Sequence, residues 1–324
     1  MPHDSTALFP GGVMGRICKL AGLILVSIFL FAAITYYRYP GVIISLSNIY
    51  SRWDAGLERM EAQAGEFRWV YLSGGTGETI VFLNGFGLGK DYWGELLKHY
   101  AGKYRIIAPD IPGFGESTRK KDACYDIPHQ TARFRDFVNV IGMEKFHLVG
   151  VSMGGAIAAY FTAGNPGRVK SLLLMDAFGV RSPVPSRAQI RFLNKRENIL
   201  SYRTPEEFDN VMKLIFLNPP EMPAHFKAYI TEVGAGEYTL QNRIFEELLH
   251  GGADILEGSL RNIQAPTLVI WGAEDSLFHP SSADRFAGTV QKCRIFIVDK
   301  CGHLPHLEKP KEVIKRYDKF LAEL

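Results

Sequence analysis

The sequence lacks a strong excess of charge of either sign. Its 324 residues include 37 Lys plus Arg and 34 Asp plus Glu, which gives a formal net charge of +3 at pH 7. Proteins that bind nucleic acid usually carry a pronounced basic excess or a basic stripe. The balanced charge therefore argues against a nucleic-acid partner. Low-complexity tracts and internal repeats are also missing, so neither a disordered chain nor a solenoid is expected.

Cysteine is scarce, and the four cysteines form no recognisable pattern. They stand at positions 18, 124, 293 and 301. The last two flank a predicted strand, Arg294–Asp299, and the eight residue steps from Cys293 to Cys301 span about 26 Å of extended chain. That is far more than the Cα separation that a disulfide bridges. The sequence therefore predicts neither a disulfide framework nor a metal site.

Charge is absent from a long segment near the N-terminus. Residues 20–34 are uncharged and residues 35–37 extend the run, with Lys19 before it and Arg38 after it. The length is near the lower limit for a helix that spans a bilayer, about 17–20 residues. We predict a membrane anchor within residues 1–40, and the basic side chains before it favour a non-cytoplasmic catalytic domain.

Two other interpretations compete for this segment. A signal peptide requires a small-residue cleavage site after a shorter apolar core, and Ala32–Ala33 fits that requirement poorly. A buried core helix normally carries some polar positions, and this segment carries almost none.

Residues 41–65 are predicted to form an amphipathic linker helix. It lies either on the membrane surface or against the body of the protein. The prediction rests on apolar side chains at helical spacing, namely Val42, Leu46, Ile49, Trp53, Leu57 and Met60.

From residue 66 the chain alternates between strands and helices. This alternation predicts an α/β fold with a mostly parallel sheet and helices on both faces. It is interrupted over residues 180–255, where we predict a helical cap, so the core comprises residues 66–179 and 256–324. The predicted strands are Phe67–Leu72, Thr79–Leu83, Tyr104–Pro109, Phe146–Val151, Val169–Met175, Thr267–Trp271 and Arg294–Val298.

Residues 150–154 read GVSMG and match the G-x-S-x-G pattern. A buried strand, Phe146–Val151, enters the motif, and a helix of small residues, Met153–Ala163, leaves it. A serine at such a sharp turn has a strained backbone, and the flanking glycines supply the necessary space. The helix N-terminus also places positive potential beside Oγ. We therefore predict that Ser152 is a catalytic nucleophile.

A serine nucleophile needs a base and an acid that orients the base. His303 stands between the last predicted strand and the last predicted helix, as the order Ser, acid, His requires. His306 is the second candidate, although its place at the start of a helix explains it equally simply. Asp275, in the loop after the penultimate strand, is the predicted acid. Asp176, at the end of the preceding strand, is the alternative.

The oxyanion hole requires two backbone N–H donors. Met153, directly after the nucleophile, is expected to provide one of them. Phe86, in the loop after the strand Thr79–Leu83, is expected to provide the other. Gly85 and Gly87 allow the backbone of this loop to approach the substrate oxygen.

Four segments, PDIPGFGEST, VGVSMGG, WGAEDSLF and CGHLPHLEKP, resemble the α/β-hydrolase superfamily of serine hydrolases. The resemblance extends from residue 66 to the C-terminus. With the N-terminal apolar segment and the cap segment TPEEFDNVMKLIF, the chain is similar to the membrane-anchored monoacylglycerol lipase branch and related bacterial lipases. It departs from the family at Asn84, where the oxyanion loop usually has histidine.

These features together predict a membrane-anchored carboxylic-ester hydrolase that needs no cofactor or metal ion. The resemblance implies lipid esters, monoacylglycerol in particular, as substrates, and apolar side chains of the cap are expected to line an acyl pocket. One alternative is a carbon–carbon bond hydrolase of the meta-cleavage type, which has a similar SMGG elbow but soluble substrates. Another is a non-catalytic binding protein, which is expected to have lost a triad residue.

Overall fold

A computed structural model describes residues 11–188, 190, 198–252 and 254–324. Eight strands form a single sheet in the order β1-β2-β4-β3-β5-β6-β7-β8. The first two pairings in this order are antiparallel, and the rest are parallel. The strands are β1 (Leu57–Ala64), β2 (Phe67–Gly74), β3 (Thr79–Leu83), β4 (Arg105–Pro109), β5 (Phe146–Val151), β6 (Val169–Met175), β7 (Thr267–Gly272) and β8 (Cys293–Val298).

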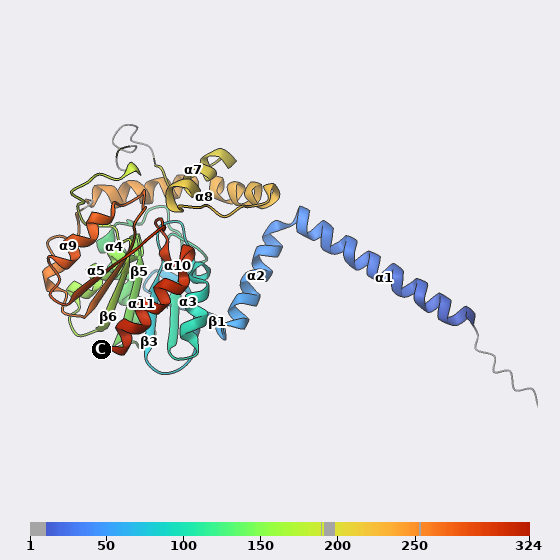
Figure 1. Ribbon diagram of the computed structural model, residues 1–324, viewed down its shortest axis with the longest axis horizontal. Coiled ribbons are helices and arrows are strands. Elements are labelled where there is room, and N and C mark those ends of the chain that lie inside the picture. Colours follow the sequence, from blue (N-terminus) through green and yellow to red (C-terminus); the bar gives the residue numbers. More distant parts are fainter. Residues whose placement is uncertain (1–10, 189, 191–197, 253) are drawn as a thin grey trace, which may run out of the picture.

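Helices cover both faces of this sheet, which confirms the predicted α/β-hydrolase fold (Figure 1). One apolar core lies between the sheet and the helices α4 (Ile127–Val140), α5 (Met153–Gly164) and α9 (Ala283–Ala287). The other lies between the sheet and the helices α3 (Glu95–Ala101) and α11 (Pro310–Ala322). Shorter helical turns are η1 (Lys90–Trp93), η2 (Leu260–Asn262), η3 (Pro280–Ser282) and α10 (Pro305–Glu308).

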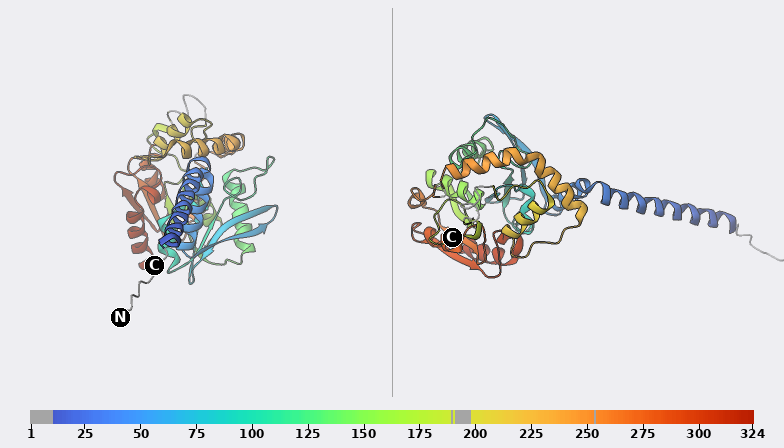
Figure 2. Two further views of the ribbon diagram at one scale, coloured as in Figure 1. Left: turned by 90° about the vertical axis from the view of Figure 1, so that its right-hand side faces the viewer. Right: turned by 90° about the horizontal axis from the view of Figure 1, so that it is seen from above.

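The cap follows β6, as predicted. Its described helices are α7 (Pro205–Ile215) and the 27-residue α8 (Ala224–His250). Both lie over the end of the sheet at which the parallel strands finish, with α8 crossing the top of the molecule (Figures 1 and 2). In α/β sheets, this carboxyl end is where ligands bind.

The predicted linker helix at 41–65 is wrong in its second half. Helix α2 (Pro40–Asp54) ends early, and residues Leu57–Ala64 form β1, all eight of which pair with β2. Gly56 and Gly65 adopt φ values of +65° and +57°. These left-handed conformations end the helix and turn the strand, respectively. The apolar spacing that continues past Asp54 therefore does not reflect a helix.

The apolar stripe of α2 faces away from the body of the protein. Val42, Leu46, Ile49 and Trp53 are between 47% and 74% exposed. The alternative in which this stripe packs on the body is therefore wrong for these four side chains.

Helix α1 (Gly11–Arg38) extends away from the rest of the molecule (Figure 1). Within Gly15–Arg38 the mean hydropathy reaches 2.5, and the helix is long and apolar enough to cross a membrane. None of this apolar stretch is buried against the rest of the protein, so the alternative of a buried core helix is wrong. At the base of the helix, the rings of Tyr36 and Tyr37 lie 4.8 and 5.1 Å from the ring of His225 at the start of α8.

Candidate active site

Ser152 lies at the sharp turn between β5 and α5, with φ 55° and ψ −121°. Side chains at the neighbouring glycines would prevent this turn. A Cβ on Gly150 would lie 2.4 Å from the carbonyl oxygen of Gly154, and one on Gly154 would lie 2.2 Å from that of Leu83. The Ser152 N–H donates to the Met175 carbonyl oxygen at 2.9 Å, which ties the turn to β6. The local sequence thus holds the serine in a conformation that side chains rarely adopt.

His303 and Asp275 form a buried pair beside this turn. The Nδ1 atom of His303 lies 2.9 Å from Oδ2 of Asp275. The other carboxylate oxygen accepts hydrogen bonds from the N–H groups of Leu277 and Phe278, at 2.7 and 3.0 Å. The His303 Nε2 atom is buried and has no hydrogen-bond partner among the described residues. The arrangement leaves this nitrogen available to a proton donor in the site.

Asp176 lies within the same buried group. Carboxylate oxygens of Asp176 and Asp275 and a ring nitrogen of His303 all lie within 4.8 Å of one another. Oδ1 of Asp176 accepts a hydrogen bond from Gly272 N–H at 3.0 Å. Burial, and then the facing Asp275 carboxylate, raise the pKa of Asp176 well above its usual range. The surroundings of Asp176 therefore favour its protonated form.

Two neighbours of the pair have other surroundings. His306 is fully buried, and its ring lies 4.7 Å from that of Trp93. Burial, with His303 nearby, lowers the pKa of His306 to about 3, so this ring is neutral at working pH. Glu274 accepts a hydrogen bond from the Cys301 N–H at 2.8 Å, so it braces the histidine loop.

Phe86 and Met153 both border the space around Ser152. A Cβ on Gly85 would lie 3.2 Å from Cβ of Ser152, so the loop passes close to the serine. The Asn84 side chain donates to the Pro109 carbonyl oxygen at 3.0 Å. It thereby fastens the start of the loop that carries Phe86.

Two cavities meet at Ser152. The larger, about 600 Å³, is also lined by His303 and by side chains of the cap helix α7, among them Phe208 and Met212. The smaller, about 90 Å³, is lined almost entirely by apolar side chains from the core and the cap, among them Phe278 and Leu248. Sequence analysis predicted an apolar pocket under the cap, but not its division into two.

The end of α7 contacts the histidine loop directly, which the sequence did not indicate. The His303 N–H donates to the Ile215 carbonyl oxygen at 2.9 Å. The Glu308 carboxylate accepts from Gly302 N–H at 2.8 Å and from Leu217 N–H at 2.9 Å. Glu308 therefore joins the cap to the loop that carries His303.

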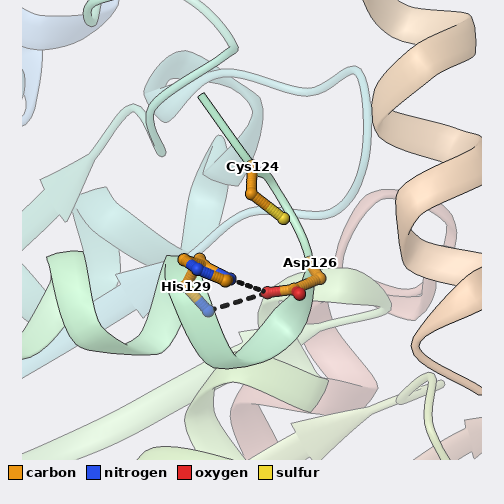
Figure 3. A group of neighbouring side chains, drawn as sticks. All are labelled: Cys124, Asp126 and His129. Carbon is orange, nitrogen blue, oxygen red and sulfur yellow. Dashed lines mark hydrogen bonds and ion pairs between the residues drawn. The ribbon is translucent and has the colours of Figure 1, made fainter. Parts of the chain in front are cut away.

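Two groups of side chains have the residue types of a metal site. One is the buried Asp176, Asp275 and His303. The other is Cys124, Asp126 and His129, near the start of α4 (Figure 3). Asp126 caps α4 by accepting from His129 N–H at 2.8 Å, and it lies 2.7 Å from His129 Nδ1. Helix capping thus accounts for the contact between Asp126 and His129.

The fold and the elbow belong to a known class. Residues 80–316 match the model of the alpha/beta hydrolase family. Since this match covers most of the chain, the protein is a member of that family.

Several known proteins are similar to this protein over most of its length. The chain is 27% identical to monoacylglycerol lipase abhd6-A of Xenopus laevis, with 96% of each chain covered. It is 27% identical to Lipase 1 of Psychrobacter immobilis, over 84% of this chain and 86% of that lipase. The solved structure of a bacterial membrane phospholipase A superposes with a TM-score of 0.84 and 34% identity, over 94% of this chain and 98% of that one.

Proposed function

We propose that this protein is a membrane-anchored serine hydrolase that cleaves the ester bonds of lipids, with monoacylglycerol as its first candidate substrate. One observation carries the proposal. Ser152 and His303 both line the larger cavity, which is also lined by apolar side chains of the cap. The relatives, which include a monoacylglycerol lipase and a bacterial lipase, support the same substrate class.

In the proposed reaction, Ser152 Oγ attacks the ester carbonyl while His303 Nε2 takes its proton. Asp275 holds the imidazole through Nδ1 and stabilises its cation. The backbone N–H groups of Phe86 and Met153 bind the developing oxyanion. His303 then protonates the leaving alcohol, and water releases the fatty acid from the acyl-enzyme with His303 again as base.

Membrane attachment through α1 is part of the proposal. The helix is long and apolar enough to span a bilayer, and none of its apolar run within Gly15–Arg38 is buried. Lys19 precedes the apolar run, which favours a cytoplasmic N-terminus and a catalytic domain on the opposite side.

A second candidate substrate is a diacyl phospholipid. It is favoured by the 34% identity to the bacterial membrane phospholipase A over nearly the whole chain. The two cavities at Ser152 also offer separate spaces for an acyl chain and for the rest of a larger lipid.

The decisive experiment compares substrates on purified full-length protein in detergent, with Ser152→Ala as the control. Each buried methylene contributes about 0.8 kcal/mol, so kcat/KM is expected to rise roughly threefold to fourfold per carbon until the cavity is filled. Monoacylglycerol is expected to react faster than triacylglycerol, because a covered cavity admits one chain more easily than three. Faster release of fatty acid from a dilauroyl phospholipid than from monolauroylglycerol would favour the second candidate.

The carbon–carbon bond hydrolase remains the alternative within the enzymes. It predicts poor turnover of esters at every chain length and rapid cleavage of a vinylogous diketone acid. A flat or falling chain-length profile would remove the lipid-ester proposal and leave a general serine hydrolase. A non-catalytic binding protein is disfavoured because all three proposed triad residues are present and Asp275 pairs with His303.

A further inference from the structure

The loop that carries Phe86, residues 84–89, ends at a cluster of ion pairs formed by Lys90, Asp110 and Glu116. Lys90, at the end of this loop, is only 2% exposed. The side-chain Nζ of Lys90 lies 2.9 Å from Oδ2 of Asp110 and 2.5 Å from Oε1 of Glu116. The backbone N–H of Lys90 donates to Asp110 Oδ1 at 2.6 Å. A buried ammonium group requires such partners. The end of the loop is therefore fixed by the carboxylates of residues 110 and 116.

The start of the loop is fastened to the segment that carries Asp110. The Asn84 side chain donates to the Pro109 carbonyl oxygen, next to Asp110. A Cβ on Gly89 would lie 3.1 Å from Asp110 Oδ1, so the backbone there lies close against the carboxylate. Residues 84–89 thus span two fixed points, and movement of either point moves the loop.

Helix α2 supplies the outer half of this network. Arg52 pairs with Asp91 through two parallel hydrogen bonds, from Nε and Nη2, each 2.7 Å long. Its Nη2 also lies 3.7 Å from Glu116 Oε1. The side chains of Arg52 and Asp91 are 16% and 18% exposed, and bidentate pairs of this kind are strong and geometrically specific. Asp91 follows Lys90 directly, so α2 is linked to the end of the loop.

The charge states of the network match this geometry. The hydrogen bond with Asp91 raises the pKa of Arg52. Burial of Glu116 opposes its ionisation, but the hydrogen bonds from Lys90 and Arg59 prevail and lower its pKa to about 2. Arg52 and Glu116 are therefore both charged from weakly acidic to alkaline pH.

We propose that Arg52 is a positioning residue for the oxyanion loop, so that the placement of α2, the helix that follows α1, sets the rate of turnover. The inference rests on the proposed function, because residues 84–89 matter for rate only if the Phe86 amide binds an oxyanion. A misplacement of about 1 Å in an active site costs about 100-fold in rate. Loss of one outer support is expected to lower kcat by about 10-fold, a part of that effect.

The test uses the full-length protein with p-nitrophenyl butyrate in detergent. Arg52→Ala is expected to lower kcat by about 10-fold and to leave KM nearly unchanged, because an oxyanion contact acts mainly in the transition state. Arg52→Lys is expected to fall between Ala and wild type, since a single ammonium group cannot reproduce the bidentate geometry.

Asp54→Asn is the matched control. Asp54 lies on the same helix and pairs with Lys98 of α3 at 2.6 Å, but neither residue belongs to the network around Lys90. Because this pair is exposed, its loss is expected to change kcat by less than about 2-fold. The control separates an effect of Arg52 on the loop from a general loosening of α2.

Equal effects of Arg52→Ala and Asp54→Asn would overturn the inference, as would an unchanged kcat or an effect on KM alone. If Arg52→Ala fails to fold, Arg52→Lys carries the test, and a kcat equal to that of wild type would overturn the inference. Failure of the proposed function is distinguishable, because the wild-type protein would then neither hydrolyse the ester nor react with a fluorophosphonate at Ser152.

Discussion

At the scale of single residues, two buried carboxyl groups beside His303 have different chemistry. Asp275 accepts hydrogen bonds from two backbone N–H groups and pairs with the imidazole. Asp176 accepts one, from Gly272, and its Oδ2 has no hydrogen-bond donor among the described residues. Hydrogen-bond donors stabilise the ionised form of a carboxyl group. Asp275 therefore has more of the partners that a carboxylate anion requires than Asp176 has.

This difference predicts the ranking of two isosteric variants. Asp275→Asn is expected to lower kcat by about 10⁴, as loss of a triad aspartate does. Asp176→Asn is expected to lower it by less than about 10-fold, because an amide keeps the size and hydrogen bonds of a protonated carboxyl, and Asn tolerates the observed φ of 45°. Steady-state kinetics on a p-nitrophenyl ester give both values. The opposite ranking would assign the acid role to Asp176.

The raised pKa of Asp176 also predicts a pH dependence of stability. The groups that face it are Asp275, His303 and Glu308, with the Cys301 thiol nearby. A group whose pKa is higher in the folded state stabilises the fold fully below its unfolded pKa, and this stabilisation is lost as the pH rises through the folded value. Asp176→Asn removes this titration. The melting temperature of the variant relative to wild type is therefore expected to increase from pH 4 to pH 8, and a constant difference would contradict a protonated Asp176.

At the scale of elements, buried strands were the easiest to predict. The predicted bounds of β3, β5 and β6 match the structure residue for residue, because strands covered on both faces are continuous apolar runs. Strand β1 was missed, because it is an edge strand whose polar residues, such as Glu58 and Gln63, give no apolar alternation. Its pairing with β2 depends on contacts that are not local in sequence.

Some residues of the candidate site can likewise be predicted from the sequence, whereas others cannot. Ser152, Asp275 and His303 stand in short motifs at strand ends, so sequence indicates them without a structure. Arg52 and Glu308 carry no local signal. Their importance arises from partners 39 and 91 residues away in the chain, which only the fold brings together.

The nucleophile turn predicts a contrast between two glycines of α5. A Cβ on Gly154 would lie 2.2 Å from the Leu83 carbonyl oxygen, whereas one on Gly164 would meet nothing within 4 Å. Gly154→Ala is expected to cost about 3 kcal/mol of unfolding free energy, since rigid backbone must move. Gly164→Ala is expected to be neutral or to stabilise by about 0.5–1 kcal/mol. Urea unfolding measures both, and equal stabilities would contradict the close packing of α5 on β3.

At the scale of the whole molecule, a folded hydrolase body is joined to an exposed apolar helix (Figure 2). The exposed side chains of α1 and the apolar stripe of α2 together form a surface that water solvates poorly. In the proposed membrane-anchored state a bilayer would remove this cost for α1, and the ring contacts of Tyr36 and Tyr37 would hold the start of α8 close to the membrane.

Attachment to the bilayer is therefore expected to resist treatments that release peripheral proteins. Full-length protein should remain with the membrane fraction after a carbonate wash, because an apolar helix of this length inserts rather than adsorbs. A variant that lacks residues 1–38 provides the comparison. Intact wild-type protein found mainly in the soluble fraction, with its N-terminus still present, would contradict a spanning helix.

The central claim, a serine hydrolase whose nucleophile is Ser152, is tested most directly by covalent labelling. Purified protein is treated with a fluorophosphonate, and the modified residue is identified by peptide mass spectrometry alongside the Ser152→Ala variant. The account predicts one adduct, on Ser152, no labelling of the variant, and a loss of about 10⁴–10⁶ in turnover. Full labelling of the variant, or an adduct on a different residue in the wild-type protein, would contradict it.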